Sequence, residues 1–308
     1  MVGLMTTFVG LPTAADVAAA AVTIRSHARR TPLLRTVLRG RPVLFKLEHL
    51  QLGGSFKLRG AINALSCVDH PARVVTASGG NHGLAVATAA TLLGVPATVY
   101  VPRTAPESKT RRIEATGAQL IRHGANYAEA AAAALAAVTS QDVYLPAYDH
   151  PDVIAGQGTV GAEIVADAPE VDAVVVAVGG GGLAAGTALG IGDRTTVAVE
   201  TEGCNALNAA LKAGHPVDTD VDSIAASALG ATRVGDLPFA VLNSPRTLSV
   251  LVSDAELLVA QELLWEEYRL AVEPAAAAPL AAWLAGRVPA ELPCIVLCGA
   301  NSAWITER

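Results

Sequence analysis

The sequence predicts an α/β fold with two mainly parallel sheets and a cleft between them. Short runs rich in β-branched residues alternate with longer stretches rich in alanine and leucine. This alternation is typical of parallel strands connected by helices. Glycine-rich turns follow several of the predicted strands. Because open α/β sheets bind ligands at the carboxyl ends of their strands, these turns are the expected site.

The hydrophobic pattern places each element along the chain. The predicted strands are Val43–Glu48, Arg73–Ala77, Ala97–Val101, Ala118–His123, Ala173–Val178, Thr196–Glu200 and Cys294–Cys298. The predicted helices are Asn81–Leu93, Glu107–Thr116, Tyr127–Ser140, Val153–Ala166, Ala255–Leu270 and Ala275–Ala285. A first helix is expected after the capping box "TAAD", Thr13 to Asp16. We expect a large domain, residues 1–71 and 149–308, with a small domain, residues 72–148, inserted in it.

Composition argues against several classes of function. Hydrophobic residues make up 52% of the 308 residues and charged residues 16%, which is typical of a compact globular protein. The formal net charge is −6 and no Lys/Arg-rich run occurs, so we expect no nucleic-acid partner. The N-terminus lacks the basic region of a signal peptide, and apolar runs such as "AEAAAAALAAV" are too short to cross a bilayer. We therefore expect no membrane partner.

The cysteines indicate neither a metal site nor a disulfide framework. The four are Cys67, Cys204, Cys294 and Cys298. They form no CxxC pair, and no histidine cluster accompanies them at zinc spacing, so no metal is expected. Scattered thiols in a chain of this length indicate a reducing compartment, and hence a cytoplasmic protein.

The segment "GGSFKLRG", Gly53 to Gly60, places Lys57 between a phenylalanine and a leucine–arginine pair. Such a lysine could be a solvated charge at the start of a helix. It could equally be a nucleophile in a pocket, where burial lowers the pKa of the amine so that it can attack a carbonyl. The segment alone leaves both possibilities open.

The loop "TASGGNHG", Thr76 to Gly83, follows a predicted strand and opens a predicted helix. Its uncovered backbone N–H groups and the positive end of the helix could bind a carboxylate or a phosphate. The alternative is a tight turn with Asn81 as the N-cap, which explains the glycines but not His82.

The loop "AVGGGGLAAG", Ala177 to Gly186, contains four consecutive glycines, an arrangement that allows several N–H groups to converge on one phosphate. A dinucleotide site is a competing interpretation. Gly180, Gly182 and Ala185 fit the G-x-G-x-x-G/A pattern, and Glu200 follows Gly180 by 20 residues, as a ribose-binding acid would. That interpretation leaves the segment around Lys57 unexplained.

In "IVLCGAN", Ile295 to Asn301, Cys298 ends a predicted strand beside a glycine. A buried structural cysteine is the commoner role. The place of Cys298 at the carboxyl end of a strand keeps a functional role open.

Taken together, "SFKLRG", "SGGNHG", "GGGGL" and "CGAN" resemble, in order and spacing, the serine/threonine dehydratase family, which includes serine racemase. These are pyridoxal-phosphate enzymes of the tryptophan-synthase β fold (fold type II), with two parallel-sheet α/β domains and the cofactor in the cleft between them. The resemblance extends to "DVIAGQGT" and "VEPAAAA" and so covers nearly the whole chain.

The resemblance implies a role for each motif. Lys57 is similar to the Schiff-base lysine that also serves as catalytic base, with Phe56 against the pyridine ring. Asn81 is similar to the asparagine that bonds the cofactor's 3-hydroxyl, and Cys298 stands where relatives carry Ser or Cys facing the pyridine nitrogen. The other implied cofactor-binding residues are Gly179, Gly180, Gly181, Gly182 and Leu183. The implied binding site for the substrate carboxylate is Ser78, Gly79, Gly80, Asn81 and His82.

Two departures from the racemase branch matter. That branch has a proton-donating serine two residues before its equivalent of Asn81, whereas this chain has Gly79, which argues against racemisation. The racemase branch also binds a divalent cation through two acids. Glu200 matches one, but Ala206 stands at the other position, where Glu202 or Asn205 could substitute. Arg59 is expected to form ion pairs or pack rather than bind substrate, and Glu273 is either near the cofactor or a helix N-terminal acid.

The resemblance implies a pyridoxal-phosphate-dependent ammonia-lyase. It would convert a small β-hydroxy amino acid, such as L-threonine or L-serine, to a 2-oxo acid and ammonia. An amino-acid racemase or another hydroxy-amino-acid dehydratase of this fold is the alternative, followed by an NAD-dependent dehydrogenase or a binding protein without turnover. A homodimer is expected from the resemblance alone.

Overall fold

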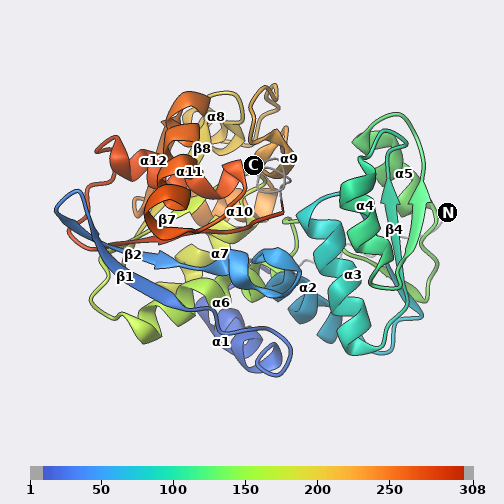
Figure 1. Cartoon of the computed structure of the whole chain (residues 1–308). Helices are drawn as coiled ribbons and strands as arrows, with labels where there is room; N and C mark the ends of the chain where they lie inside the picture. The colour runs from blue at the N-terminus through green and yellow to red at the C-terminus, as the bar shows by residue number, and fades with distance from the viewer. Residues whose placement is uncertain (1–9, 302–308) are drawn as a thin grey trace.

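The fold is organised by two separate sheets (Figure 1). The structure is a computed structural model that describes residues 10–301. The larger sheet has the order β1-β2-β10-β7-β8-β9. Its strands are β1 (Leu33–Leu38), β2 (Arg41–Lys46), β7 (Ala173–Ala177), β8 (Thr195–Thr201), β9 (Thr247–Val252) and β10 (Pro293–Val296). All neighbours are parallel except β1, which pairs antiparallel with β2 at the edge.

The smaller sheet has the order β5-β4-β3-β6 and is entirely parallel. Its strands are β3 (Arg73–Ala77), β4 (Ala97–Val101), β5 (Gln119–Arg122) and β6 (Asp142–Tyr144). They all fall inside the segment that the sequence assigns to a small domain. The limits of the two domains, 1–71 with 149–308 and 72–148, stay a prediction.

Helices cover both sheets. They are α1 (Ala14–Thr23), α2 (Lys57–Ser66), α3 (Asn81–Leu93), α4 (Glu107–Glu114), α5 (Tyr127–Ala136), α6 (Pro151–Asp167), α7 (Gly182–Gly190), α8 (Ala206–Ala213), α9 (Ala226–Leu229), α10 (Asp236–Leu242), α11 (Asp254–Tyr268) and α12 (Pro274–Leu284). Figure 1 shows α3, α4 and α5 grouped around β4, apart from the helices of the larger sheet. Helix α2 packs against both α3 and α6 and so joins the two groups.

The centre of the larger sheet is apolar throughout. Strand β7, "AVVVA", is buried at every position, as expected for a parallel strand covered on both faces. Helices α6 and α7 approach closely because Gly158 faces Gly186: a Cβ on Gly158 would lie 2.6 Å from the Gly186 carbonyl oxygen. This contact fixes the start of α7, where the four-glycine loop ends.

The predicted strands and helices are present, with shifted ends, and the capping box at Thr13 and Asp16 is confirmed. The strand expected over Cys294–Cys298 ends at Val296, because the chain then leaves the sheet to pair with the loop before Lys57. The sequence analysis assigns no strand to β1, β6 or β9 and no helix to α2, α7, α8, α9 or α10. No helix within residues 10–301 is long and apolar enough to cross a membrane. Residues 1–9, which include most of the N-terminal segment inspected for a signal peptide, lie outside the described residues.

Candidate active site

Lys57 is the first residue of α2, and its side chain is partly buried. Its Nζ donates a 2.8 Å hydrogen bond to the carbonyl oxygen of Ala147 and lies 5.2 Å from the centre of the Phe56 ring. Burial lowers the pKa of Lys57 to about 8, although Cys298 and Glu273 act in the opposite direction. Lys57 is therefore not a solvated surface charge but an amine that can lose its proton near neutral pH.

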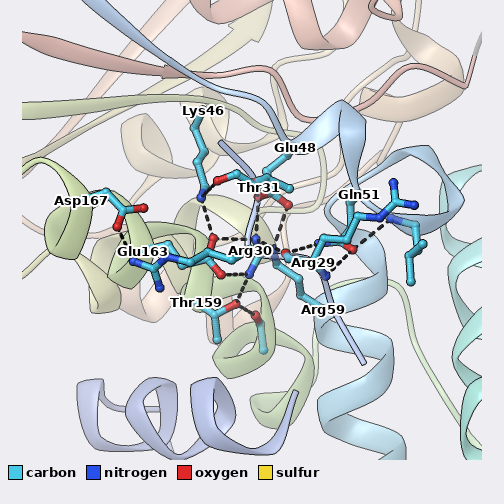
Figure 2. A network of polar contacts seen from close by, with 12 residues as sticks. Arg29, Arg30, Thr31, Lys46, Glu48, Gln51, Arg59, Thr159, Glu163 and Asp167 are labelled. Atoms are coloured by element: carbon cyan, nitrogen blue, oxygen red, sulfur yellow. Dashed lines mark hydrogen bonds and ion pairs between the residues drawn. The ribbon is translucent and has the colours of Figure 1, made fainter. Parts of the chain in front are cut away.

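A buried ionic cluster fixes α2 just behind Lys57 (Figure 2). The Arg59 guanidinium bonds Glu48 of the β2–α2 connection at 2.8 Å and Glu163 of α6 at 2.7 Å. Lys46 of β2 pairs with the same Glu163 at 2.5 Å. Burial is the largest single effect and opposes ionisation of Glu48, but the charge and hydrogen bond of Arg59, together with Lys46 and Thr31, lower the pKa of that carboxyl. Arg59 thus forms ion pairs, as the sequence predicts, and ties the start of α2 to β2 and α6.

The Ser78–His82 loop lies at the N-terminus of α3. Ser78 Oγ accepts a hydrogen bond from the Gly80 N–H at 3.2 Å, which fixes the turn. The His82 ring is buried, with Nε2 3.0 Å from the Leu145 carbonyl oxygen. Burial first, and the charge of Lys57 second, lower the pKa of His82 to about 3, so the ring is neutral. A neutral, engaged imidazole leaves the backbone as the part of this loop that can bind an anion.

The alternative in which Asn81 caps α3 is wrong, because Gly80 is the N-cap and Asn81 is the first helical residue. Its side chain instead joins a network: Nδ2 donates to Glu273 Oε1 at 2.7 Å, and Oδ1 accepts from Asn301 Nδ2 at 2.7 Å. Glu273 is also the N-cap residue of α12, so it occupies a helix N-terminus and contacts Asn81 at the same time.

The four-glycine loop connects β7 to α7. A Cβ on Gly180 would lie 2.3 Å from the Tyr148 ring, and one on Gly181, whose φ is +93°, would lie 2.7 Å from Pro238. These positions therefore require glycine, and the loop presents bare backbone at the positive end of a helix. Gly179, Gly182 and Leu183 complete the loop and the first turn of α7, with Gly182 and Leu183 buried.

Cys298 is buried at the end of the segment that follows β10. Its carbonyl oxygen accepts a 3.1 Å hydrogen bond from the Phe56 N–H, so Cys298 lies beside the residue before Lys57. Burial, with a smaller effect of the Glu273 charge, raises the pKa of Cys298 well above its ordinary value. The side chain is a neutral thiol.

Glu200 does not join these groups. It is fully buried near the end of β8, and its carboxyl oxygens accept hydrogen bonds from the N–H groups of Leu207, at 2.8 Å, and Asn208, at 2.7 Å, in the first turn of α8. Burial raises the pKa of Glu200 to about 8, although these two hydrogen bonds act in the opposite direction. A buried carboxyl group engaged in this way is not available to a ribose hydroxyl. Within residues 10–301, no group of three or more His, Cys, Asp or Glu side chains could hold a metal ion.

A cavity of about 330 Å³ opens beside Ala147, whose carbonyl accepts the hydrogen bond from Lys57. Its lining residues are Tyr127, Tyr144, Pro146, Ala147, Tyr148, Asp149, Arg233, Val234, Gly235 and Asp236. They come from α5, β6, the segment before α6, and the segment that leads into the first residue of α10, so the cavity lies between the two groups of elements. Sequence reasoning missed Tyr148, because nothing in "PAYDH" marks it as a neighbour of the glycine loop.

Comparison with known proteins identifies the family. A model of the pyridoxal-phosphate dependent enzymes matches residues 24–299. The chain is 36% identical over 277 residues to an L-threonine ammonia-lyase of Geobacter sulfurreducens, covering 86% of this chain and 69% of that protein. It is 34% identical over 284 residues to a β-hydroxyaspartate dehydratase of Paracoccus denitrificans, covering 88% and 90%. The structure of maize serine racemase superimposes with a TM-score of 0.89 at 28% identity, covering 97% of each chain.

The chain therefore belongs to the pyridoxal-phosphate dependent enzymes, and its fold is that of fold type II. The resemblance to the serine/threonine dehydratases, based on four short motifs, is confirmed. Pyridoxal phosphate is the cofactor of this family.

The residues present fit this cofactor. The bare glycine loop at the start of α7 suits a phosphate, and the lysine with a lowered pKa suits an aldehyde. Gln157 of α6 is buried beside the loop, and neither of its amide atoms has a hydrogen-bond partner among the described residues. A Cβ on Gly182 would lie 2.6 Å from Gln157 Oε1, so this amide faces the loop directly. Unpartnered buried amides are rare and indicate a bound polar group.

Proposed function

We propose that this chain is an ammonia-lyase that dehydrates and deaminates a small β-hydroxy amino acid, such as L-threonine or L-serine, to a 2-oxo acid and ammonia. The observation that carries the proposal is the Lys57 amine, whose pKa is lowered to about 8 and which contacts a carbonyl of the cavity wall. The named activities of the Geobacter and Paracoccus proteins support the same class of reaction.

Four groups of residues would hold the cofactor. Lys57 would bind its aldehyde, the Gly179–Gly182 loop its phosphate, Asn81 its ring hydroxyl, and Cys298 would face its ring nitrogen. When bound, pyridoxal phosphate supplies an aldehyde that condenses with amines and a ring that draws electrons from the substrate α-carbon.

Lys57 would act as the general base. Because burial favours its neutral form, the amine can accept the α-proton once the substrate amine has taken its place. His82 cannot share this role, since its ring is neutral and engaged with the Leu145 carbonyl.

The Ser78–His82 loop would orient the substrate. Its N–H groups surround the N-terminus of α3, where the helix dipole favours a carboxylate. Holding the substrate carboxylate there would fix the α-carbon relative to Lys57, so that one face of the substrate meets the base.

Cys298 and Gly79 favour elimination. A neutral thiol cannot hold a proton on a pyridine nitrogen as a carboxylate would, so the negative charge left by proton removal is less stabilised and early loss of the β-hydroxyl is favoured. The likeness to maize serine racemase makes racemisation the second candidate. Gly79 offers no hydroxyl to protonate the opposite face, which argues against it.

The experiment is a panel of β-hydroxy amino acids, including serine, threonine and 3-hydroxyaspartate in both enantiomers, assayed for 2-oxo acid release by the cofactor-loaded protein. Release from one enantiomer, lost in Lys57→Ala, is the expected result. Absence of a visible absorbance band after addition of pyridoxal phosphate would contradict the proposal, as would tight NAD(H) binding that survives Lys57→Ala.

We further infer a cytoplasmic homodimer. The family resemblance supports the dimer, and the free thiols of Cys67, Cys204, Cys294 and Cys298 support a reducing compartment. Sedimentation of the purified holoenzyme tests the dimer directly.

A further inference from the structure

The segment after Cys298 runs beside the loop that precedes Lys57. Two backbone hydrogen bonds, of 3.1 and 2.9 Å, join residues 298–301 to residues 53–56. The side chain of Asn301 adds a third, because its Nδ2 donates to the Gly53 carbonyl oxygen at 2.8 Å. Asn301 is thus attached to the loop that carries the lysine.

The glycine pair before Lys57 makes room for this asparagine. Gly53 and Gly54 have φ of +73° and +77°, which L side chains rarely adopt. A Cβ on Gly54 would lie 2.6 Å from Asn301 Oδ1. Gly54 is therefore explained by its φ and by the close approach of Asn301, and Gly53 by its φ alone.

Asn301 also contacts Asn81 and the partner of Asn81. Asn301 Nδ2 donates to Asn81 Oδ1 at 2.7 Å, and the Asn301 backbone N–H donates to Glu273 Oε2 at 3.2 Å. Glu273 Oε1 in turn accepts from Asn81 Nδ2 at 2.7 Å. The three residues form a closed ring of hydrogen bonds, so the amide of Asn81 is held at both of its polar atoms.

The amide of Asn301 has one favourable orientation. Its Oδ1 accepts a hydrogen bond from the Arg112 guanidinium of α4, and its Nδ2 donates to two oxygens. Turning the amide over would place an NH₂ group against a guanidinium and an oxygen against two oxygens. A fixed Asn301 therefore sets which way the Asn81 amide points.

We propose that Asn301 is a positioning residue, which orients the Asn81 amide toward the ring hydroxyl of pyridoxal phosphate. The proposal rests on the proposed cofactor-binding role of Asn81. It assigns a role to Asn301, the last residue of "CGAN", through its hydrogen bonds to Asn81, Glu273 and the Gly53 carbonyl.

The test is a double-mutant cycle on cofactor affinity. The variants are Asn301→Ala, Asn81→Ala and the double variant, with Asn243→Ala as a control at an exposed asparagine of the α10 C-terminus. Asn301→Asp keeps the acceptor for Arg112 and loses both Nδ2 donations. Each is measured as apoprotein by thermal unfolding, and then by titration with pyridoxal phosphate and by the pH dependence of the visible absorbance of the bound cofactor.

We expect Asn301→Ala and Asn301→Asp each to raise the Kd for pyridoxal phosphate about tenfold, the loss typical of one hydrogen bond. We expect the double variant to bind no more weakly than Asn81→Ala, because Asn301 acts through Asn81. The pH profile of the absorbance should shift in both Asn301 variants and not in Asn243→Ala.

Additive losses in the double variant would overturn the proposal. Asn301 variants that bind the cofactor as tightly as the unmodified protein would also overturn it. If the apoproteins of these variants in addition melt at a lower temperature, the role of Asn301 is purely structural. Failure of the unmodified protein to bind pyridoxal phosphate is a different outcome, which overturns the proposed function together with this inference.

Discussion

The Nζ of Lys57 and the carbonyl oxygen of Ala147 lie 2.8 Å apart, so the first residue of α2 is bonded directly to the wall of the cavity. Ala147 lines the cavity, so the bond joins the amine to a residue that a ligand in the cavity would contact. Burial lowers the pKa of Lys57 to about 8.

The first prediction concerns cofactor capture by the apoprotein. Only the neutral Lys57 amine can attack an aldehyde, so the second-order rate of capture should rise with pH and level off above about 8. Stopped-flow absorbance across a pH series measures this rate, with Lys57→Ala as the blank. A midpoint near the ordinary lysine value of 10.5 would contradict the assigned pKa.

The second prediction concerns the stability of the apoprotein. The folded pKa of Lys57, about 8, lies below the ordinary 10.5, so between these values the unfolded chain binds more protons and the free energy of unfolding rises with pH. Lys57→Met should therefore be more stable than the unmodified protein at pH 7, with an advantage that shrinks as the pH rises through this range. Lys212→Met, at an exposed position of α8, is the control and should show no such trend in urea unfolding.

The third prediction concerns the ionic cluster of Arg59. Arg59→Leu leaves the carboxylates of Glu48 and Glu163 without their buried partner and should lower the free energy of unfolding by ~3–5 kcal/mol. The exposed pair of Arg287 with Glu256 is the matched control, and Arg287→Leu should cost only ~0–1 kcal/mol. Equal losses of unfolding free energy in Arg59→Leu and Arg287→Leu, measured by denaturant unfolding, would show that burial does not increase the cost of breaking the Arg59 cluster.

The fourth prediction concerns Cys298. Cys298→Ser should keep much of the elimination activity, because a hydroxyl can make the same hydrogen bond as a neutral thiol. Cys298→Asp should lose elimination, because a carboxylate raises the protonation of the ring nitrogen. The ratio of 2-oxo acid release to α-proton exchange measures the effect. If Cys298→Asp is as active in elimination as Cys298→Ser, the side chain at position 298 does not determine whether the enzyme eliminates the β-hydroxyl.

The fifth prediction concerns Gly79. A Cβ there would lie 3.6 Å from Ala105 and Val101, which is ordinary contact, so Gly79→Ser should fold. We expect it to gain racemisation or α-proton exchange, whereas Gly79→Ala, which fills the same space without a hydroxyl, should not. Chiral chromatography of recovered substrate checks this. Efficient racemisation by the unmodified protein would contradict the prediction, because Gly79 would then not prevent racemisation.

The site could be predicted where a short motif carries its chemistry. The four glycines around Gly180 stand out because a run of four glycines has few other uses, and Lys57 stands out once its segment is taken together with the other three motifs. The strands β3, β4 and β7 could be predicted because each is a continuous apolar run.

Long-range partners could not be predicted in this way. Asn301 meets Asn81 across 220 residues of sequence. Tyr148 meets Gly180 across a helix and a strand. No local pattern records either contact. Strand β1 was missed because it lies at an edge, where its partly exposed "LLRTVL" lacks a clear apolar run. The alternative with Asn81 as the N-cap of α3 was wrong because Gly80 occupies the N-cap position. The Asn81 side chain is therefore free to donate a hydrogen bond to Glu273.

Strand β10, near the end of the described chain, is inserted between β2 and β7 in the middle of the larger sheet. During synthesis the ribosome therefore releases both flanking strands long before the strand that joins them. Until residues 293–301 emerge, β2 and β7 have no partner on their shared side, and the lysine loop lacks the segment that braces it. A nascent chain stalled before this point has the complete four-glycine loop but not the strand between β2 and β7. The larger sheet can close only after residues 293–301 have emerged, and such distant pairing makes folding slow.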